Sequence, residues 1–166
     1  MKTKDFAIKL RTLLPLFIST GIACGIWAAT APFIGLISWA GFAGCTTYFS
    51  CGKHGVSGFV ASSLTNLVGV LCGLATIYFD VLIPGLQGWG VGCAVFTFAM
   101  CVLSCFRLLS FCPGIFMGCF CVFGANGDLK ALIPSLIVGA ALGVLCESGG
   151  NWIKTFFVKK SASQLN

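Results

Sequence analysis

The residues of this chain that could do chemistry are a few uncharged polar groups inside long apolar stretches. Four of them follow one another closely: Asn66 comes four residues after Ser62, with Ser63 and Thr65 between them. Residues four apart share a face of a helix, so this segment would present hydroxyl and amide groups together. Such groups could replace the hydration shell of a solute crossing a membrane, or form hydrogen bonds between helices. Both interpretations stay open.

Three further polar residues stand in apolar stretches: Thr46, Thr47 and Glu147. The two threonines could line the same path or bond to a neighbouring helix. Glu147 could relay a proton or a cation if it is buried and partnered, or it could lie at the membrane interface beside Lys154 or lipid amines. The chain has no nucleophile elbow, no phosphate-binding loop, no paired carboxylates in a span and no histidine in a span. We therefore predict no enzymatic activity.

Aromatic residues and a proline suggest two further devices. The dipeptide Pro113-Gly114 could break a helix and expose backbone groups to a cavity. Four phenylalanines could form hydrophobic constrictions around a path, as gates do, or could face lipid and neighbouring helices: Phe42, Phe49, Phe116 and Phe123.

Eleven cysteines are many for 166 residues. A disulfide framework would place them in loops facing an oxidising compartment, whereas eight lie in apolar stretches, where cysteine acts as a small hydrophobe: Cys24, Cys45, Cys72, Cys93, Cys101, Cys119, Cys121 and Cys146. A soft-metal site could use Cys119 and Cys121, His54, or the group Met100, Cys101 and Cys105. The spacings match no zinc or haem pattern, so we predict no metal and no cofactor.

The composition decides which elements must hold these groups. Apolar residues make up 58% of the chain and charged residues 8%, and the mean hydropathy is +1.02. A soluble domain is about 25% charged, so a soluble globular protein is excluded. About 20 apolar residues span a bilayer, and the charge-poor stretches predict six such spans: two within Thr12–Gly52, divided near Ala31-Pro32 or Gly35, then Val56–Phe79, Val81–Phe106, Leu108–Gly127 and Ala131–Gly150.

The ten basic residues orient these spans. With a cytoplasmic N-terminus and six spans, nine fall on the cytoplasmic side and only Lys130 lies outside, a strong positive-inside bias. Asp80 and Asp128 then fall in outside loops. Residues 1–12 would form an amphipathic cytoplasmic lead-in and residues 154–166 a cytoplasmic tail. The N-terminus imitates a signal peptide, but Pro32 directly after the small-residue run predicts that it is not cleaved. The net charge of +6 suits anionic lipids; we expect no nucleic-acid partner.

A pattern repeats at one offset along the chain. The motif F-x-G-C-x-x-x-F occurs at residues 42–49 and again at 116–123, and G-V-L-C occurs at 69–72 and 143–146, both displaced by 74 residues. This offset relates residues 13–80 (spans one to three) to residues 81–153 (spans four to six). An odd number of spans per copy predicts inverted repeats, an arrangement common in channels and transporters. A duplication that merely makes a stable bundle is the alternative.

Glycines spaced by four residues predict close helix packing. Pairs such as Gly21/Gly25, Gly114/Gly118 and Gly139/Gly143 put two glycines on one helix face and let backbones approach each other. Such faces also make a homo-oligomer plausible.

Several segments resemble a known family. The stretch Leu36–Thr46, followed by Tyr48-Phe49, looks like the second span of the YcdZ-type bacterial inner-membrane proteins, as does Leu109–Gly114 with Phe116 and Gly118. Gly127-Asp128, Leu132–Leu136 and Gly149–Trp152 are similar to that family's last span and tail. The resemblance covers nearly the whole chain. It implies a multi-pass inner-membrane protein with a domain of unknown function, and no activity.

These observations predict an all-α membrane protein of six spans with both tails cytoplasmic. We expect a narrow channel or transporter for a small neutral or weakly charged solute, embedded in membrane lipids. One alternative is a non-transporting membrane scaffold or regulatory protein. Another is a thiol-dependent metal or redox protein.

Overall fold

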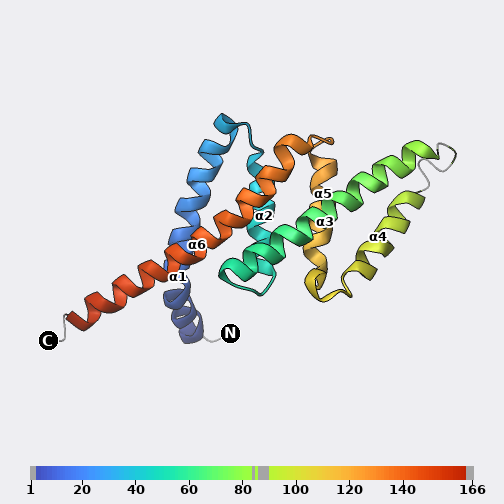
Figure 1. Ribbon diagram of the computed structural model, residues 1–166. Helices are drawn as coiled ribbons and strands as arrows, with labels where there is room; N and C mark the ends of the chain where they lie inside the picture. The colour runs from blue at the N-terminus through green and yellow to red at the C-terminus, as the bar shows by residue number, and fades with distance from the viewer. Residues whose placement is uncertain (1–2, 84, 86–89, 164–166) are drawn as a thin grey trace.

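The described part of the chain is entirely α-helical and 3-10 helical apart from its turns. The computed structural model describes residues 3–83, 85 and 90–163, and it describes their side chains except at 3–5, 7 and 157–163. In chain order the elements are α1 (Thr3–Thr30), η1 (Ala31–Ile34), α2 (Ser38–Ser50), α3 (Gly55–Leu82), α4 (Val91–Leu103), η3 (Arg107–Leu109), α5 (Cys112–Gly124) and α6 (Leu129–Ser163) (Figure 1). The predicted all-α class is confirmed.

Three helices are long and apolar enough to cross a membrane. They are the segments Ile8–Ile34, Gly55–Leu82 and Leu129–Phe156. The helices α2, α4 and α5 have 13 residues each, about 20 Å at 1.5 Å per residue, which is shorter than the ~30 Å hydrocarbon core. The prediction of six spans of similar length is therefore not confirmed.

Local rules explain where the short helices differ from the predicted spans. The helix α3 continues through Leu82, so Val81 ends a helix instead of beginning one, and Asp80 lies in its last turn and not in a loop. The helix α5 begins at Cys112 with Pro113 in its first turn, because proline fits the first turn of a helix and disfavours helix in the residue before it. The predicted break at Pro113-Gly114 is therefore a helix start, and the interruption precedes it.

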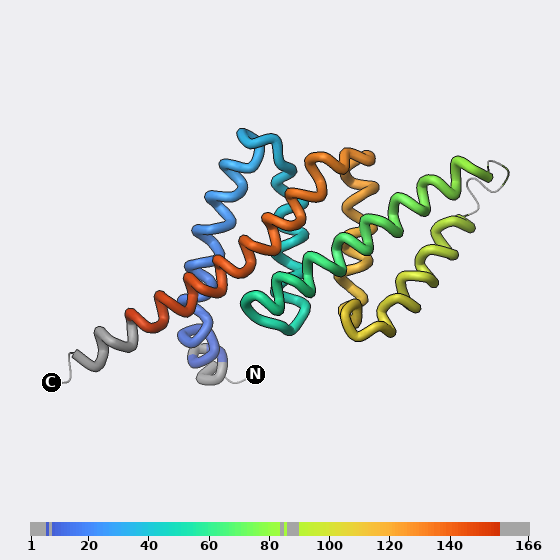
Figure 2. Tube along the Cα trace, viewed as in Figure 1, coloured from blue at the N-terminus to red at the C-terminus, as the bar shows by residue number. Residues whose placement is uncertain are grey.

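Two pairs of helices make the closest packing. The helix α3 packs along α5, and α2 packs along α6; α1 also lies against α6, while α4 lies against α3. Figure 1 shows α1 and α4 at opposite flanks of this arrangement. In Figure 2 the first turns of α1 and the last described turns of α6 point to the same end of the bundle.

Glycines permit this closeness, as predicted. A Cβ on Gly118 would lie 2.9 Å from the Cα of Asn66, and one on Gly139 would lie 2.7 Å from the Cα of Gly41. By contrast, Gly21 and Gly25 of α1 have open space around them. Close backbone contact is the main adhesion between helices in lipid, so α3–α5 and α2–α6 depend on glycine and α1 does not.

The surface of the bundle is apolar almost everywhere. Side chains such as Leu71, Phe120 and Leu145 are 64–66% exposed, while Leu132, Leu136 and Val122 are fully buried. A soluble protein rarely exposes large contiguous apolar patches. This surface is that of a membrane protein.

Candidate functional site

The predicted polar residues of α3 lie in the interior of the bundle. Ser62, Thr65 and Asn66 are 0% exposed, and Thr47 of α2 is 2% exposed. The Thr47 hydroxyl lies 3.1 Å from Asn66 Oδ1, so the structure joins two candidate residues from different helices. We call these four residues together with Ser63 the polar centre.

Asn66 has one side-chain atom without a partner. Its Nδ2 is buried and makes no hydrogen bond, while Thr47 Oγ1 also lies 2.9 Å from the carbonyl of Ala43. The two ends of an amide are interchangeable at this level of description. If the amide is turned, Nδ2 donates to the Thr47 oxygen, Thr47 donates to Ala43, and Oδ1 becomes the unpartnered atom. Either orientation leaves one polar atom of Asn66 unsatisfied.

The hydroxyls of the polar centre fall into two groups. Ser62 donates to the carbonyl of Phe59 at 3.1 Å, and Thr65 donates to that of Ala61 at 2.9 Å. These two bonds stay within α3, so neither hydroxyl links helices. The Ser63 hydroxyl is buried and has no partner. Asn66 and Ser63 are therefore the two residues whose polarity the packing does not explain.

The helix α5 closes over the polar centre. Gly114 lies against the Thr65 hydroxyl, and Gly118 lies against the carbonyl of Asn66. The absence of side chains at these two positions brings the α5 backbone onto the polar face of α3. Because Asn66 has no exposed surface, no water-sized space adjoins it, and the polar centre is closed in this conformation.

Glu147 lies in a second polar cluster, where α2, α3 and α6 meet. The Tyr48 hydroxyl donates to Glu147 Oε2. The backbone N–H of Gly55 lies 2.8 Å from the Tyr48 oxygen and 3.2 Å from Glu147 Oε2, and His54 Nδ1 lies 2.6 Å from Glu147 Oε1. The predicted neighbour Lys154 is not among the ion-pair partners in the described residues. We call Tyr48, His54, Gly55 and Glu147 the carboxylate cluster.

The local backbone explains this arrangement. Gly55 is the first residue of α3 and has φ +57°, a left-handed conformation that glycine adopts without strain. Its free N–H points at the carboxylate, and the positive end of a helix favours a negative charge there. The side chain of His54 is 82% exposed, that of Glu147 is 21% exposed, and Tyr48 is 1% exposed. The carboxylate cluster thus extends from the bundle surface to the buried residue next to Thr47.

Other predicted site residues lie elsewhere. Thr46 is exposed on the outer face of α2. The four candidate gate residues are 37–47% exposed on the outer surface, and among the described residues no aromatic pair joins two of them: Phe42, Phe49, Phe116 and Phe123. Their placement favours the lipid-facing or packing alternative over a gate.

The cysteines come together differently from the predicted metal groups. His54 pairs with Glu147, and Cys101 and Cys105 are exposed. Within the described residues, the group of three ligating side chains that the fold assembles has its sulfur atoms within 4.8 Å of one another: Cys24, Cys45 and Cys146.

Sequence reasoning did not single out Tyr48. It is one of two tyrosines in the chain and follows Thr47 directly, so a polar phenol inside an apolar stretch was the available signal. Its partner Glu147 is 99 positions away, which hides the link from any local pattern.

The comparisons with known proteins agree with this architecture. A family profile described as "Protein of unknown function (DUF1097)" matches residues 17–151. The chain belongs to this family. The resemblance to YcdZ-type proteins is thereby confirmed, since the chain is 41% identical over 145 residues to "Inner membrane protein YcdZ" of Escherichia coli, covering 87% of this chain and 89% of the relative.

Two further relatives extend the DUF1097 comparison. The YcdZ protein of Salmonella typhimurium is 37% identical over 155 residues, 93% of this chain and 97% of the relative. "Uncharacterized protein YahC" of Escherichia coli is 25% identical over 155 residues, 86% of this chain and 93% of the relative. No solved structure matches.

Proposed function

We propose that this DUF1097 protein is a small inner-membrane channel or transporter in its closed state. Its solute would be small and neutral or weakly charged and would pass the Thr47–Asn66 pair. The observation that carries the proposal is the unsatisfied side-chain atom of Asn66 at 0% exposure. Leaving a buried polar group unpaired costs about 1–3 kcal/mol, and polar groups inside membranes are functional candidates by default.

The packing of the bundle supplies a comparison within the same chain. The position 74 residues after Asn66 is Ala140, which is also 0% exposed. A Cβ on Gly44 would lie 3.0 Å from the backbone N of Ala140, as Gly118 lies against the backbone of Asn66. Since an apolar residue fills the equivalent place, close packing alone does not require an amide at Asn66.

An inverted repeat is part of the proposal, with one copy over residues 13–80 and the other over 81–153. It is supported by helix bounds: α2 begins at Ser38 and ends at Ser50, and α5 begins and ends 74 residues later; α3 and α6 begin 74 residues apart. The two closest packings, α3 on α5 and α2 on α6, exchange under this offset. The polar centre involves α2 and α3 of one copy and α5 of the other, where the path lies in such proteins.

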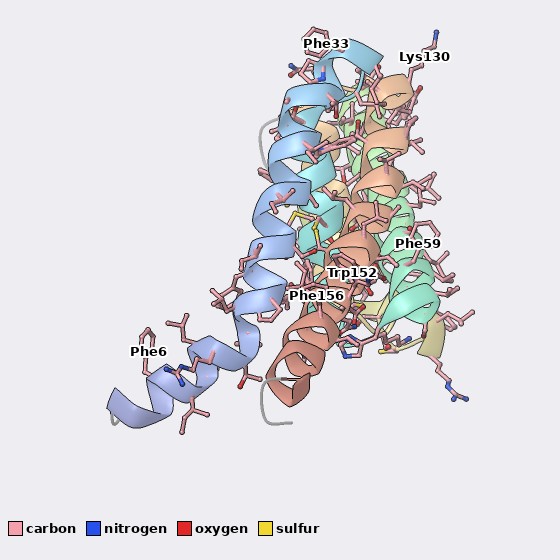
Figure 3. All side chains as sticks on the ribbon, turned by 90° about the vertical axis from the view of Figure 1, so that its left-hand side faces the viewer. Phe6, Phe33, Phe59, Lys130, Trp152 and Phe156 are labelled. Atoms are coloured by element: carbon pink, nitrogen blue, oxygen red, sulfur yellow. The ribbon has the colours of Figure 1, made fainter. Side chains whose placement is uncertain are left out.

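We further propose six membrane-embedded helices with both tails cytoplasmic. The short helices α2, α4 and α5 would cross with the help of their connecting turns. Lys130 lies at the opposite end of the bundle from Phe6 and Phe156 (Figure 3), which suits the positive-inside distribution of the basic residues. The relatives' names support the inner membrane. A homo-oligomer stays a prediction, which native mass spectrometry can check.

The carboxylate cluster would close one end of the path. Tyr48 and Thr47 are adjacent on α2, and they contact Glu147 and Asn66 respectively. A row of polar groups therefore leads from the exposed His54 to the buried Asn66. Opening would separate Tyr48 from Glu147 and let water reach Thr47.

Solute flux into proteoliposomes tests the proposal. Stopped-flow light scattering with a panel of small uncharged solutes should show protein-dependent flux for at least one of them. Asn66→Leu should abolish this flux. Thr76→Val is the matched control, because Thr76 is also buried on α3 and donates within its helix to Cys72 at 2.9 Å, and it should leave flux unchanged. Absence of flux for every solute would favour the non-transporting scaffold.

A further inference from the structure

Three helices bring three thiols to one point inside the bundle. Cys24 comes from α1, Cys45 from α2 and Cys146 from α6, and their sulfur atoms lie within 4.8 Å of one another. Cys45 is 5% exposed and Cys146 is 0% exposed, while Cys24 is half-buried. We call these three residues the thiol site.

The spacing of the sulfur atoms fits a single metal ion. Metal–thiolate bonds are about 2.3 Å long, so three sulfurs arranged trigonally around one ion lie about 4.0 Å apart by geometry. The sulfurs of the thiol site are already within this range and need only small side-chain rotations. Three helices distant in sequence have to be held in register to achieve this.

The other half of the chain provides a contrast. The positions 74 residues from Cys45 and Cys146 are Cys119 and Cys72, which pack together in one buried cluster. The position 74 residues after Cys24 is Phe98, which is 71% exposed. Among the described residues only the thiol site therefore has three sulfurs in contact range. Two buried cysteines suffice for packing in one half, and the third distinguishes the other.

We propose that the thiol site binds one Cu(I) ion, independently of solute passage through the polar centre. Thiolate sulfur selects soft ions such as Cu(I), and three ligands suit Cu(I) better than structural zinc, which takes four. Binding replaces thiol protons: each cysteine that becomes a thiolate ligand releases one proton to solvent, and copper stays in the +1 state throughout. No electron transfer is involved.

A groove gives the ion a route to the thiol site. It has a volume of about 510 Å³ and lies between α1 and α2, lined by Leu16, Phe17, Thr20, Gly21 and Phe49. Thr20 is four residues before Cys24, and Phe49 is four residues after Cys45, so the groove opens about one helical turn from both thiols.

Competition for Cu(I) tests the site. Purified protein in detergent is titrated anaerobically with Cu(I), buffered by a chromogenic chelator and kept reduced with ascorbate. We expect one tightly bound ion per chain. Cys45→Ser and Cys146→Ser should each weaken binding by more than the ~10–100-fold that loss of an outer hydrogen-bond partner costs a metal site. Cys119→Ser and Cys72→Ser, at the equivalent positions, should bind as the unchanged protein does.

Two results would overturn the proposal. One is undiminished Cu(I) binding in Cys45→Ser or Cys146→Ser; the other is an equal loss in the control variants, which would indicate non-specific thiol binding. X-ray absorption of the copper-loaded, unsubstituted protein avoids any dependence on variant folding. It should show a shell of sulfur ligands alone, and a shell of nitrogen or oxygen would exclude the thiol site.

Discussion

Replacement of Asn66 by leucine should make the protein more stable. Leucine has nearly the shape of asparagine and carries no polar atom, so it fits a site with 0% exposure without a large change in volume. It removes the unsatisfied amide atom, a group whose burial costs about 1–3 kcal/mol. It also removes the bond to Thr47, worth about 0.6 kcal/mol for an average hydrogen bond between membrane helices.

The net expectation is a gain of about 1–2 kcal/mol in the free energy of unfolding, the difference of these two terms. Thr47 itself stays satisfied because its hydroxyl can donate to Ala43. The measurement is reversible unfolding by SDS in mixed micelles, followed by far-UV circular dichroism. Thr76→Val serves again as the control and should change the free energy by no more than about 0.6 kcal/mol.

A clear loss of stability in Asn66→Leu would refute the reasoning. It would mean that both ends of the amide have partners in the membrane, so that Asn66 links helices and bears no cost. The proposed path would then lose its main support. A gain of stability with loss of flux is the outcome that joins the energetic cost to function.

The remaining predictions concern packing, the carboxylate cluster and topology. Gly118→Ala should destabilise the protein by about 1–3 kcal/mol, as overpacking does, whereas Gly25→Ala, with open space around it, should be neutral or slightly stabilising; thermal unfolding in detergent distinguishes them, and equal effects would contradict the close α3–α5 contact. Tyr48→Phe removes the phenol hydroxyl that donates to Glu147, so it should lower stability by about 1 kcal/mol and raise solute flux in proteoliposomes; unchanged flux would show that this contact does not close the path. A cysteine in place of Lys130 should react with an impermeant maleimide in intact cells, and labelling only after lysis would reverse the proposed orientation.

Part of the fold follows from local rules and was predictable. The third span, predicted at Val56–Phe79, is the core of the helix Gly55–Leu82. The predicted division near Pro32 and Gly35 is a short 3-10 turn that ends at Gly35 with φ +71°. Proline and glycine act through their own backbone geometry, so neighbours hardly alter the outcome.

Helix length was harder to predict than helix position. An apolar stretch shows that a segment avoids water, but loops buried against protein also avoid water. The predicted fifth span began at Leu108, whereas α5 begins at Cys112. Burial and helicity are separate properties, and only the second depends on where backbone hydrogen bonds begin.

The sequence by itself determined that this is a helical membrane protein, because apolar excess and scarce charge are properties of composition. It also placed Asn66, Ser62 and Thr65 on one helix face, because that depends only on spacing. The tertiary structure decided which groups meet: Tyr48 with Glu147, Thr47 with Asn66, and Cys24 with Cys45 and Cys146. These contacts join helices that glycine allows to approach closely, and the partners of a close contact depend on how helices cross, which no local pattern records.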